Sequence, residues 1–137
     1  MDFNAHELAQ DYHEGQTYGK HDYYAYHLVG VAHMVKDFSD DPDAVTAAIL
    51  HDILEDTDCT ASVLAYNGIP TRVIEAVVLL TKTKGYDKDE YLDRIARNPL
   101  AKAVKMADST FNLKNSLKSG SRKRVAKYCY YLTRLVQ

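Results

Sequence analysis

Residues 47–57 join an apolar run directly to one histidine and three acids. In a helix, Glu55 lies four residues after His51 and three after Asp52, and Asp56 lies four after Asp52, so these four side chains share one face. The apolar neighbours on the other faces indicate that the segment is buried. A helix end with its acids in solvent is the alternative. Because burying carboxylates is costly without a compensating cation, the pattern favours a divalent metal site.

Further candidate ligands lie in two other predicted helices. Asp108 and Asn112 are four residues apart beside an apolar stripe, where a carboxylate and an amide need a partner. A lone histidine on an apolar face, as His27 is, usually belongs to the core. Together with His51 and Asp52, however, His27 and Asp108 complete a set of two imidazoles and two carboxylates from three helices. That set suits catalytic Mn²⁺, Fe²⁺, Zn²⁺ or Mg²⁺ with open positions for water.

The elements that must position these residues are all helical. Apolar periodicity, the capping pair Asp41-Pro42 and the breakers Gly15, Gly19 and Gly120 predict seven or eight helices, with a loop at residues 16–20. The expected helices cover residues 3–14, 22–35, 42–57, 60–66, 70–80, 88–98, 99–119 and 121–137. Short connections between them predict a compact all-α domain over residues 1–137.

Length and composition limit the classes of protein to consider. A chain of 137 residues has room for one hydrophobic core and not for two. No apolar run approaches the roughly 18 residues of a membrane span, and the N-terminus lacks signal-peptide features, so we expect no membrane contact and a cytoplasmic location. Cys59 and Cys129 cannot form a disulfide framework there, and no chemistry is assigned to them.

The net charge of −2 conceals an asymmetry along the chain. Residues 101–137 hold nine lysines or arginines and the single acid Asp108, a net charge of +8. Such a segment could bind a phosphorylated ligand or nucleic acid, contact the acidic part of the same or another subunit, or form a solvated basic helix face. The sequence leaves a homo-oligomer open and does not favour nucleic acid over a small nucleotide.

A series of motifs resembles those of the HD-domain metal-dependent phosphohydrolases. The resemblance is strongest to the hydrolase domain of the RelA/SpoT alarmone enzymes and their small single-domain relatives, which are all-α bundles. It spans residues 5–114 and rests on His13-Glu-Gly-Gln16, Tyr24-x-x-His27, residues 47–57, Leu80-Thr81 and residues 105–112. An HD pair alone is a weak signal, whereas HD-x-x-E-D-T together with K-x-A-D-x-x-x-N is strong.

The resemblance implies a role for each matching position. The metal ligands would be His27, His51, Asp52 and Asp108, with Mn²⁺ as the expected ion. Glu55 and Asp56 match the acidic pair that activates water, and Asn112 matches a residue that contacts the nucleotide sugar or supports the ligands. Cations are then needed for the phosphoryl oxygens. The substrate-binding candidates are Tyr18, Lys20, Lys82, Lys84, Arg94, Lys102, Lys105 and Asn112.

The chain departs from the family pattern in the loop before His27. After Gly15-Gln16 the alarmone hydrolases usually carry an Arg-Lys pair, where this chain has Tyr18 and Gly19, and Lys20 comes one place later. Tyr23 replaces a proline. A tyrosine ring can stack on a base but supplies no charge.

Three functions are therefore weighed. The first is Mn²⁺-dependent removal of the 3′-pyrophosphate from ppGpp-like nucleotides, favoured by Glu55-Asp56-Thr57. The second is hydrolysis of another nucleotide or phosphoester, favoured by the missing Arg-Lys pair. The third is a non-catalytic module that binds a nucleotide or nucleic acid, which the retained acidic pair argues against.

Overall fold

The computed structural model describes residues 3–136, and most of these are helical, which confirms the all-α prediction. The α-helices are α1 (Phe3–Tyr12), α2 (Val29–Met34), α3 (Pro42–Leu50), α4 (Ile53–Asp56), α5 (Ala61–Tyr66), α6 (Thr71–Leu80), α7 (Lys88–Ala96), α8 (Pro99–Ser119) and α9 (Arg122–Leu135). A π-helix, η1 (Tyr23–Leu28), leads into α2, and a 3₁₀ turn, η2 (Val35–Asp37), follows it.

Side-chain caps fix where the helices begin. The carboxylate of Asp41 accepts a hydrogen bond from the Asp43 amide at the start of α3, and Asn98 caps α8 in the same way through the Ala101 amide. Proline occupies the first turn of both helices, where no amide hydrogen is needed. Asp87 and Ser121 cap α7 and α9. These starts agree with those predicted from the sequence.

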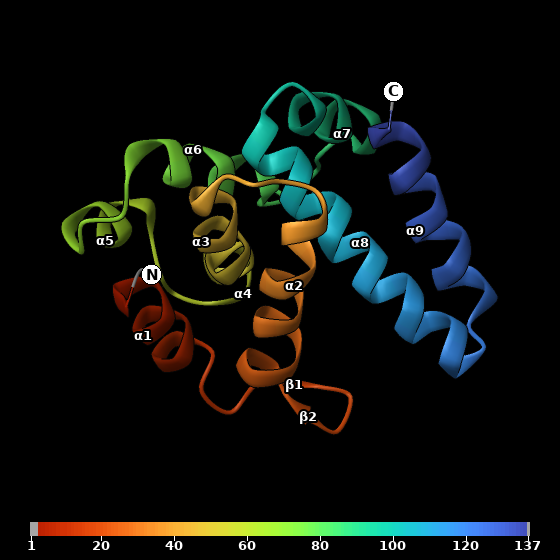
Figure 1. Ribbon diagram of the computed structural model, residues 1–137, viewed down its shortest axis with the longest axis horizontal. Coiled ribbons are helices and arrows are strands. Elements are labelled where there is room, and N and C mark those ends of the chain that lie inside the picture. The colour runs from red at the N-terminus through yellow and green to blue at the C-terminus, as the bar shows by residue number, and fades with distance from the viewer. Residues whose placement is uncertain (1–2, 137) are drawn as a thin grey trace.

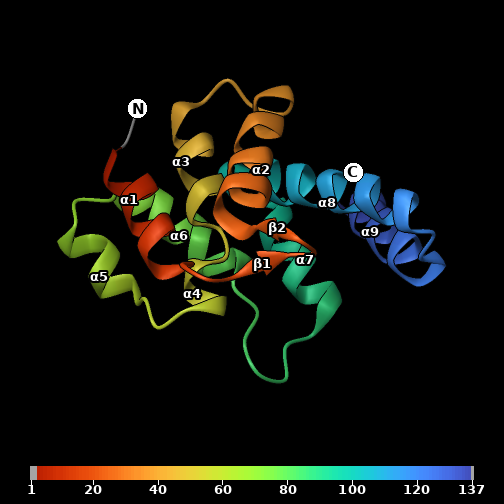
Figure 2. The same cartoon turned by 90° about the horizontal axis from the view of Figure 1, so that it is seen from below.

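Helix α8 is the axis on which the other elements pack. Helices α2, α3, α6 and α7 contact it, and α9 returns antiparallel along its length (Figure 1). Seen from below, the α8–α9 pair extends from the remaining helices as an arm (Figure 2). None of the helices within residues 3–136 has the length and apolar character required to cross a membrane. The largest buried apolar side chains are Leu28, Ile49, Leu50, Ile53, Leu64, Leu92, Ile95 and Leu135.

The segment predicted as a loop forms a small β-hairpin. Strands β1 (Thr17–Tyr18) and β2 (His21–Asp22) pair antiparallel, and Gly19 supplies a positive φ of 59° in the turn. A positive φ is accessible to glycine without a Cβ clash. The hairpin lies directly before η1 and places the Tyr18 ring beside His27.

The helix predicted over residues 42–57 is interrupted, so the expectation of one continuous acidic face is wrong. Helix α3 ends at Leu50, and His51 and Asp52 form a turn before α4. Asp52 has φ −104° and ψ −2°, and the His51 ring is hydrogen-bonded back to the Ala48 carbonyl. A regular helix would place two consecutive side chains about 100° apart around its axis. This turn instead directs the side chains of both His51 and Asp52 toward α8.

Gly30 is required where α2 crosses α8. A Cβ at this position would lie 2.5 Å from Cε2 of Phe111. We expect Gly30→Ala to lower the free energy of unfolding by about 1–3 kcal/mol, because the ring must shift within a packed interior. Urea denaturation measures this loss.

The double variant Gly30→Ala/Phe111→Leu is the matched control, because the smaller side chain leaves room for the new methyl group. It should be more stable than the sum of the two single changes implies. Strict additivity would show that Gly30 and Phe111 are not in contact.

Candidate metal centre and substrate cleft

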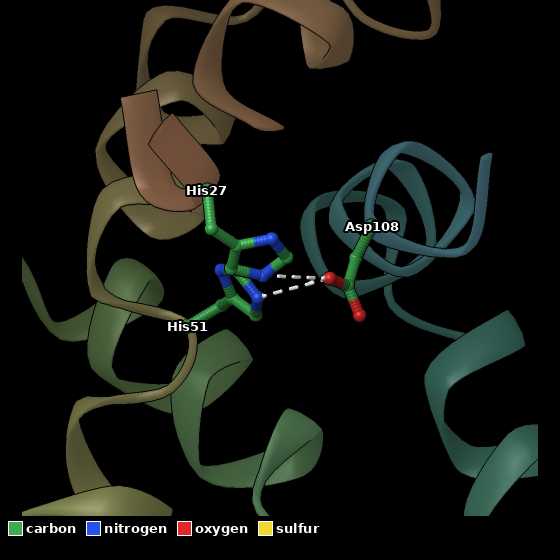
Figure 3. A group of neighbouring side chains, drawn as sticks. All are labelled: His27, His51 and Asp108. Atoms are coloured by element: carbon green, nitrogen blue, oxygen red, sulfur yellow. Dashed lines mark ion pairs between the residues drawn. The ribbon is translucent and has the colours of Figure 1, made fainter. Parts of the chain in front are cut away.

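Three parts of the chain bring the predicted ligands together. His27 lies near the end of η1, His51 and Asp52 lie in the turn between α3 and α4, and Asp108 projects from the middle of α8. Figure 3 shows the two imidazoles side by side and facing the carboxylate of Asp108. His27, His51 and Asp108 are buried.

The atoms that could bind a metal are close to one another. Nε2 of His27 is 3.1 Å from Oδ1 of Asp108, and Nε2 of His51 is 3.4 Å from the same oxygen (Figure 3). One ligand atom from each of these three residues lies within 4.8 Å of the others. Asp52 adds a fourth group, with its Oδ2 3.1 Å from Nε2 of His51 and 3.5 Å from Nε2 of His27.

The tautomer of His51 explains why a cation fits here. Its Nδ1 lies 2.6 Å from the carbonyl oxygen of Ala48, which can only accept, so Nδ1 carries a hydrogen. In a neutral ring, Nε2 would then present a lone pair to the oxygens of Asp52 and Asp108. That contact is repulsive unless a proton or a metal ion lies between them. A histidine whose second nitrogen donates to a carbonyl is the usual arrangement of a metal ligand.

Aromatic rings hold His27 in place. The Tyr18 ring stacks on it with centroids 4.9 Å apart and planes inclined by 13°, and Phe111 meets it edge-on at 5.0 Å. Tyr23 lies 5.0 Å away on a tilted plane. Because three rings surround the imidazole, its rotamer is fixed, and Nε2 stays directed at the carboxylates.

Hydrogen bonds orient the two carboxylates. The hydroxyl of Tyr23 donates to Oδ2 of Asp52. Asn112 donates its amide to Oδ1 of Asp108 at 3.2 Å, and the hydroxyl of Tyr18 donates to Oδ1 of Asn112 at 2.7 Å. Tyr18 and Tyr23, two of the departures from the family pattern, therefore both support the candidate metal ligands.

Charge coupling within the cluster links stability to pH. Burial disfavours the protonated His51 ring, but the charges of Asp52 and Asp108 raise its pKa well above 6.5. Burial likewise raises the pKa of both carboxyl groups, yet the histidines more than offset it and hold the pKa of Asp52 and Asp108 below 3.8. A raised histidine pKa stabilises the fold fully below pH 6.5, and this stabilisation is lost as pH rises through the folded-state pKa.

We expect chelator-treated protein to lose stability between pH 6 and pH 9. Its Tm should fall across this range, because the stabilisation that comes from the raised pKa of His51 is lost as pH rises through that pKa. Adding a divalent metal should flatten the profile, since the cation replaces the proton between the rings and the carboxylates. His33→Gln, which alters an exposed histidine of α2, should leave the profile unchanged. An equal Tm at both pH values in metal-free protein would show that His51 is not charged.

A cavity of about 250 Å³ opens beside the cluster. Three lysines line it together with the metal-binding groups: Lys82 follows α6, Lys105 lies one turn before Asp108 on α8, and Lys127 is on α9. The cavity therefore combines a candidate metal site with cations that can bind phosphoryl oxygens. The remaining lining residues are Tyr18, Tyr23, Glu55, Asp56, Leu80, Tyr91, Val104, Asn112, Tyr128 and Tyr131.

The two acidic residues of α4, Glu55 and Asp56, lie in different environments. Oε1 of Glu55 accepts a hydrogen bond from the backbone amide of Lys82 at 2.6 Å, which ties α4 to the segment after α6. Asp56 has no such anchor on its carboxylate. Partial burial, followed by the charges of Asp52 and Glu55, raises the pKa of Asp56 to about 6. A carboxylate with a pKa near neutrality is suited to accept a proton from water.

Comparison with known families identifies this arrangement. The family described as "HD domain" matches residues 5–130, which is nearly the whole chain. The chain belongs to the HD-domain family. The resemblance found from the motifs is thereby confirmed.

This HD domain is similar to proteins of alarmone metabolism. It is 31% identical over 145 residues to guanosine-3′,5′-bis(diphosphate) 3′-pyrophosphohydrolase of Haemophilus influenzae, covering 93% of this chain and 21% of that protein. It is 32% identical over 135 residues to the bifunctional (p)ppGpp synthase/hydrolase SpoT of Escherichia coli K12, covering 90% and 19%. The chain spans about a fifth of the length of these two relatives.

A solved structure has the same fold. It is described as a metazoan ortholog of SpoT that hydrolyses ppGpp, and it shares 25% sequence identity with this HD domain at a TM-score of 0.72. The match covers 99% of this chain and 85% of that chain. The likeness therefore extends over the whole helical arrangement.

Four of the eight predicted substrate contacts, Lys20, Lys84, Arg94 and Lys102, lie outside the metal cavity of this HD domain. Lys20 lines an adjoining outer cavity of about 580 Å³, together with Arg124 of α9. Arg94 pairs with Glu90 one turn away on α7 and is not among the residues that line either cavity. Tyr18 lies in the lining of both cavities. Lys82, Lys105 and Asn112 line the metal cavity, and their contact with a substrate stays a prediction.

Helix α9 contributes groups that the sequence did not point to. Lys127, Tyr128 and Tyr131 line the metal cavity, and Arg124 lines the outer one. In the sequence these residues belong to the basic segment whose role stayed open. The spacing of Arg124, Lys127, Tyr128 and Tyr131 at intervals of three and four residues places them on one helical face, which is the signal that could have found them.

Proposed function

We propose that this HD domain is a metal-dependent phosphohydrolase that removes the 3′-pyrophosphate from ppGpp-like nucleotides. One observation carries the proposal: two histidines and two carboxylates converge in a cavity that three lysines and a carboxylate of raised pKa also line. Metal ligands, a proton acceptor and cations for phosphate are the parts that such a hydrolysis needs. The similarity to alarmone hydrolases supports the choice of substrate.

Different residues of this chain would bind the metal, accept a proton and position the proton acceptor. A divalent ion held by His27, His51, Asp52 and Asp108 would lower the pKa of bound water and draw charge from a phosphoryl oxygen. Asp56, whose pKa is raised to about 6, accepts the proton that the attacking water loses. Glu55 holds α4 against the backbone of residue 82 and so fixes the position of Asp56.

The register of α8 orients the substrate. Lys105, Asp108 and Asn112 line the metal cavity in that order, and Asn112 and Ser116 line the outer cavity. Ser116 lies eleven positions after Lys105, which is about 16 Å along the helix axis. The pyrophosphate would bind between Asp108 and Lys105, with the nucleoside passing Asn112 and Tyr18 into the outer cavity.

Mn²⁺ is the ion proposed for this site. Two imidazoles and two carboxylates, with positions left for water and substrate, form a mixed nitrogen and oxygen set that suits Mn²⁺ and also accommodates Fe²⁺ or Zn²⁺. Geometry and availability decide between these ions more than raw affinity does.

A second candidate function changes the substrate and keeps the chemistry. The hydroxyl of Tyr18 donates a hydrogen bond to Asn112, and the Tyr18 ring stacks on His27. Tyr18 therefore presents neither a cation nor a free hydroxyl donor to a base. Hydrolysis of another nucleotide or phosphoester is the outcome that this arrangement favours over a guanine-specific site.

Turnover of a nucleotide panel tests both functions. Metal-free protein is reloaded separately with Mn²⁺, Fe²⁺, Zn²⁺ and Mg²⁺ and incubated with ppGpp, pppGpp, their adenosine counterparts and 5′-monophosphates, and the products are separated by charge. Metal-dependent release of pyrophosphate from ppGpp supports the first function. Release of inorganic phosphate from a monophosphate, or activity on adenosine compounds alone, supports the second. No turnover with metal bound would contradict both.

A further inference from the structure

Lys105 is a lysine buried in the wall of the metal cavity. Only 7% of its surface is exposed, although its side chain contributes to the cavity lining. Its Nζ lies 4.9 Å from the centre of the Tyr131 ring and 5.3 Å from that of the Tyr91 ring. The ammonium group is therefore enclosed between two aromatic faces from α9 and α7.

The ammonium has no anionic partner within the part of the chain that the structure describes. Among residues 3–136 the structure contains no hydrogen bond or ion pair to its Nζ, although lysines are almost never buried without a partner. Two aromatic faces offset part of the desolvation. Burial lowers the pKa of Lys105, while the charges of Asp108, Asp52 and Glu55 act in the opposite direction. A buried cation without a partner lowers stability and therefore needs a reason to be present.

The enclosure holds the ammonium in a fixed place. Tyr91 and Tyr131 are 8% and 4% exposed, and the Tyr91 hydroxyl donates to the carbonyl of Leu80 at 2.7 Å. By contrast, Lys82 and Lys127 are less deeply enclosed. Lys105 is thus the lysine of the cavity whose position is set before a ligand arrives, which is what stabilisation of a developing charge requires.

We propose that Lys105 is a catalytic residue whose ammonium contacts the phosphoryl oxygens of the substrate pyrophosphate. This inference rests on the function proposed above. The pyrophosphate anion would contact the side of the Lys105 ammonium that the two tyrosine rings leave open. Lys105 lies one helical turn from Asp108. As the oxygen of the attacking water bonds to phosphorus, the bond between phosphorus and the 3′-oxygen breaks, and the proton that Asp56 takes from the water passes to the 3′-oxygen, which leaves as a hydroxyl. Lys105 neutralises negative charge on the phosphoryl oxygens of the pyrophosphate, and it neither gains nor loses a proton.

Lys105→Met separates this role from a structural one. Methionine keeps the length of the apolar stem and removes the charge, and replacing a buried charge by an apolar group is often neutral or stabilising. Lys114→Met, on an exposed position of the same helix, is the matched control. Three quantities are measured on Mn²⁺-loaded protein: affinity for inorganic pyrophosphate by calorimetry, bound metal by elemental analysis, and Tm.

We expect Lys105→Met to weaken pyrophosphate binding about 10- to 100-fold, the effect of losing a hydrogen bond to a charged group. Metal content should be unchanged, Tm should be equal or higher, and Lys114→Met should match the wild type. Unchanged pyrophosphate affinity in Lys105→Met, whatever its Tm, would overturn the proposal. A wild-type protein that binds no pyrophosphate would also overturn it. Pyrophosphate binding that depends on Lys105 in a protein without nucleotide turnover would uphold the contact with pyrophosphate, but it would overturn both the catalytic role of Lys105 and the proposed function.

Discussion

Asp108→Asn should abolish both metal binding and turnover. Oδ1 of Asp108 lies within 3.4 Å of Nε2 of both histidines, so this one oxygen joins the two imidazoles of the site. An amide at this position offers a neutral oxygen or an N–H group, which cannot balance a divalent cation. Loss of a group that merely supports a ligand costs about 10- to 100-fold in metal affinity, and loss of the ligand itself should cost more.

Equilibrium dialysis followed by elemental analysis measures the metal, and pyrophosphate release measures turnover. Circular dichroism checks that the variant stays folded, because removing one partner from a buried charge cluster is destabilising. Asp37→Asn, on an exposed position of η2, is the control and should retain both properties. Normal metal content in Asp108→Asn would remove Asp108 from the ligand set, and normal turnover would remove the cluster from the mechanism.

Asp56→Asn should retain the metal and lose turnover by about 10²- to 10⁴-fold, the usual contribution of a general base. The carboxylate must be unprotonated to accept a proton, so wild-type kcat/KM should be high above the pKa of Asp56 and fall as pH decreases through it. That pKa is about 6 in the protein without a cation. A bound divalent ion favours the charged form, so the acid limb of the loaded protein should lie at or below about pH 6.

The pH profile distinguishes a proton acceptor from a structural acid. Asp56→Asn should have low activity with no acid limb in this range, whereas Asp58→Asn, at an exposed position two residues later, should keep the wild-type profile. Glu55→Gln can still accept the Lys82 amide through its side-chain oxygen, and it should lose less activity than Asp56→Asn. An unchanged acid limb in Asp56→Asn would assign the proton transfer to another group.

The sequence determined the helical class and most helix starts, because these depend on local chemistry. Asp41-Pro42 and Asn98-Pro99 supply a capping oxygen and a residue without an amide hydrogen, and both form the predicted caps. The ligand positions His27, His51, Asp52 and Asp108 were also accessible from the sequence, since each places a metal-binding group within an apolar helical pattern. Their assignment as ligands stays a prediction that Asp108→Asn tests.

The tertiary structure alone decided how those groups meet. The turn at His51 and Asp52 interrupts a segment whose composition predicts a continuous helix, and contacts with α8 rather than local propensity select it. The bonds of Tyr18 to Asn112 and of Tyr23 to Asp52 join residues that are 94 and 29 positions apart. Such pairings depend on how helices pack, and no periodicity within one segment encodes them.

The same reason applies to the basic C-terminal segment. Composition shows its charge and residue spacing shows which side chains share a face, but neither shows which neighbouring element that face meets. Packing of α9 along α8 turns Lys127 and Tyr131 into the metal cavity, and Tyr131 then encloses Lys105 together with Tyr91 of α7. The sequence therefore determined which chemical groups are available, and the packing of α7, α8 and α9 decided which of them face the substrate.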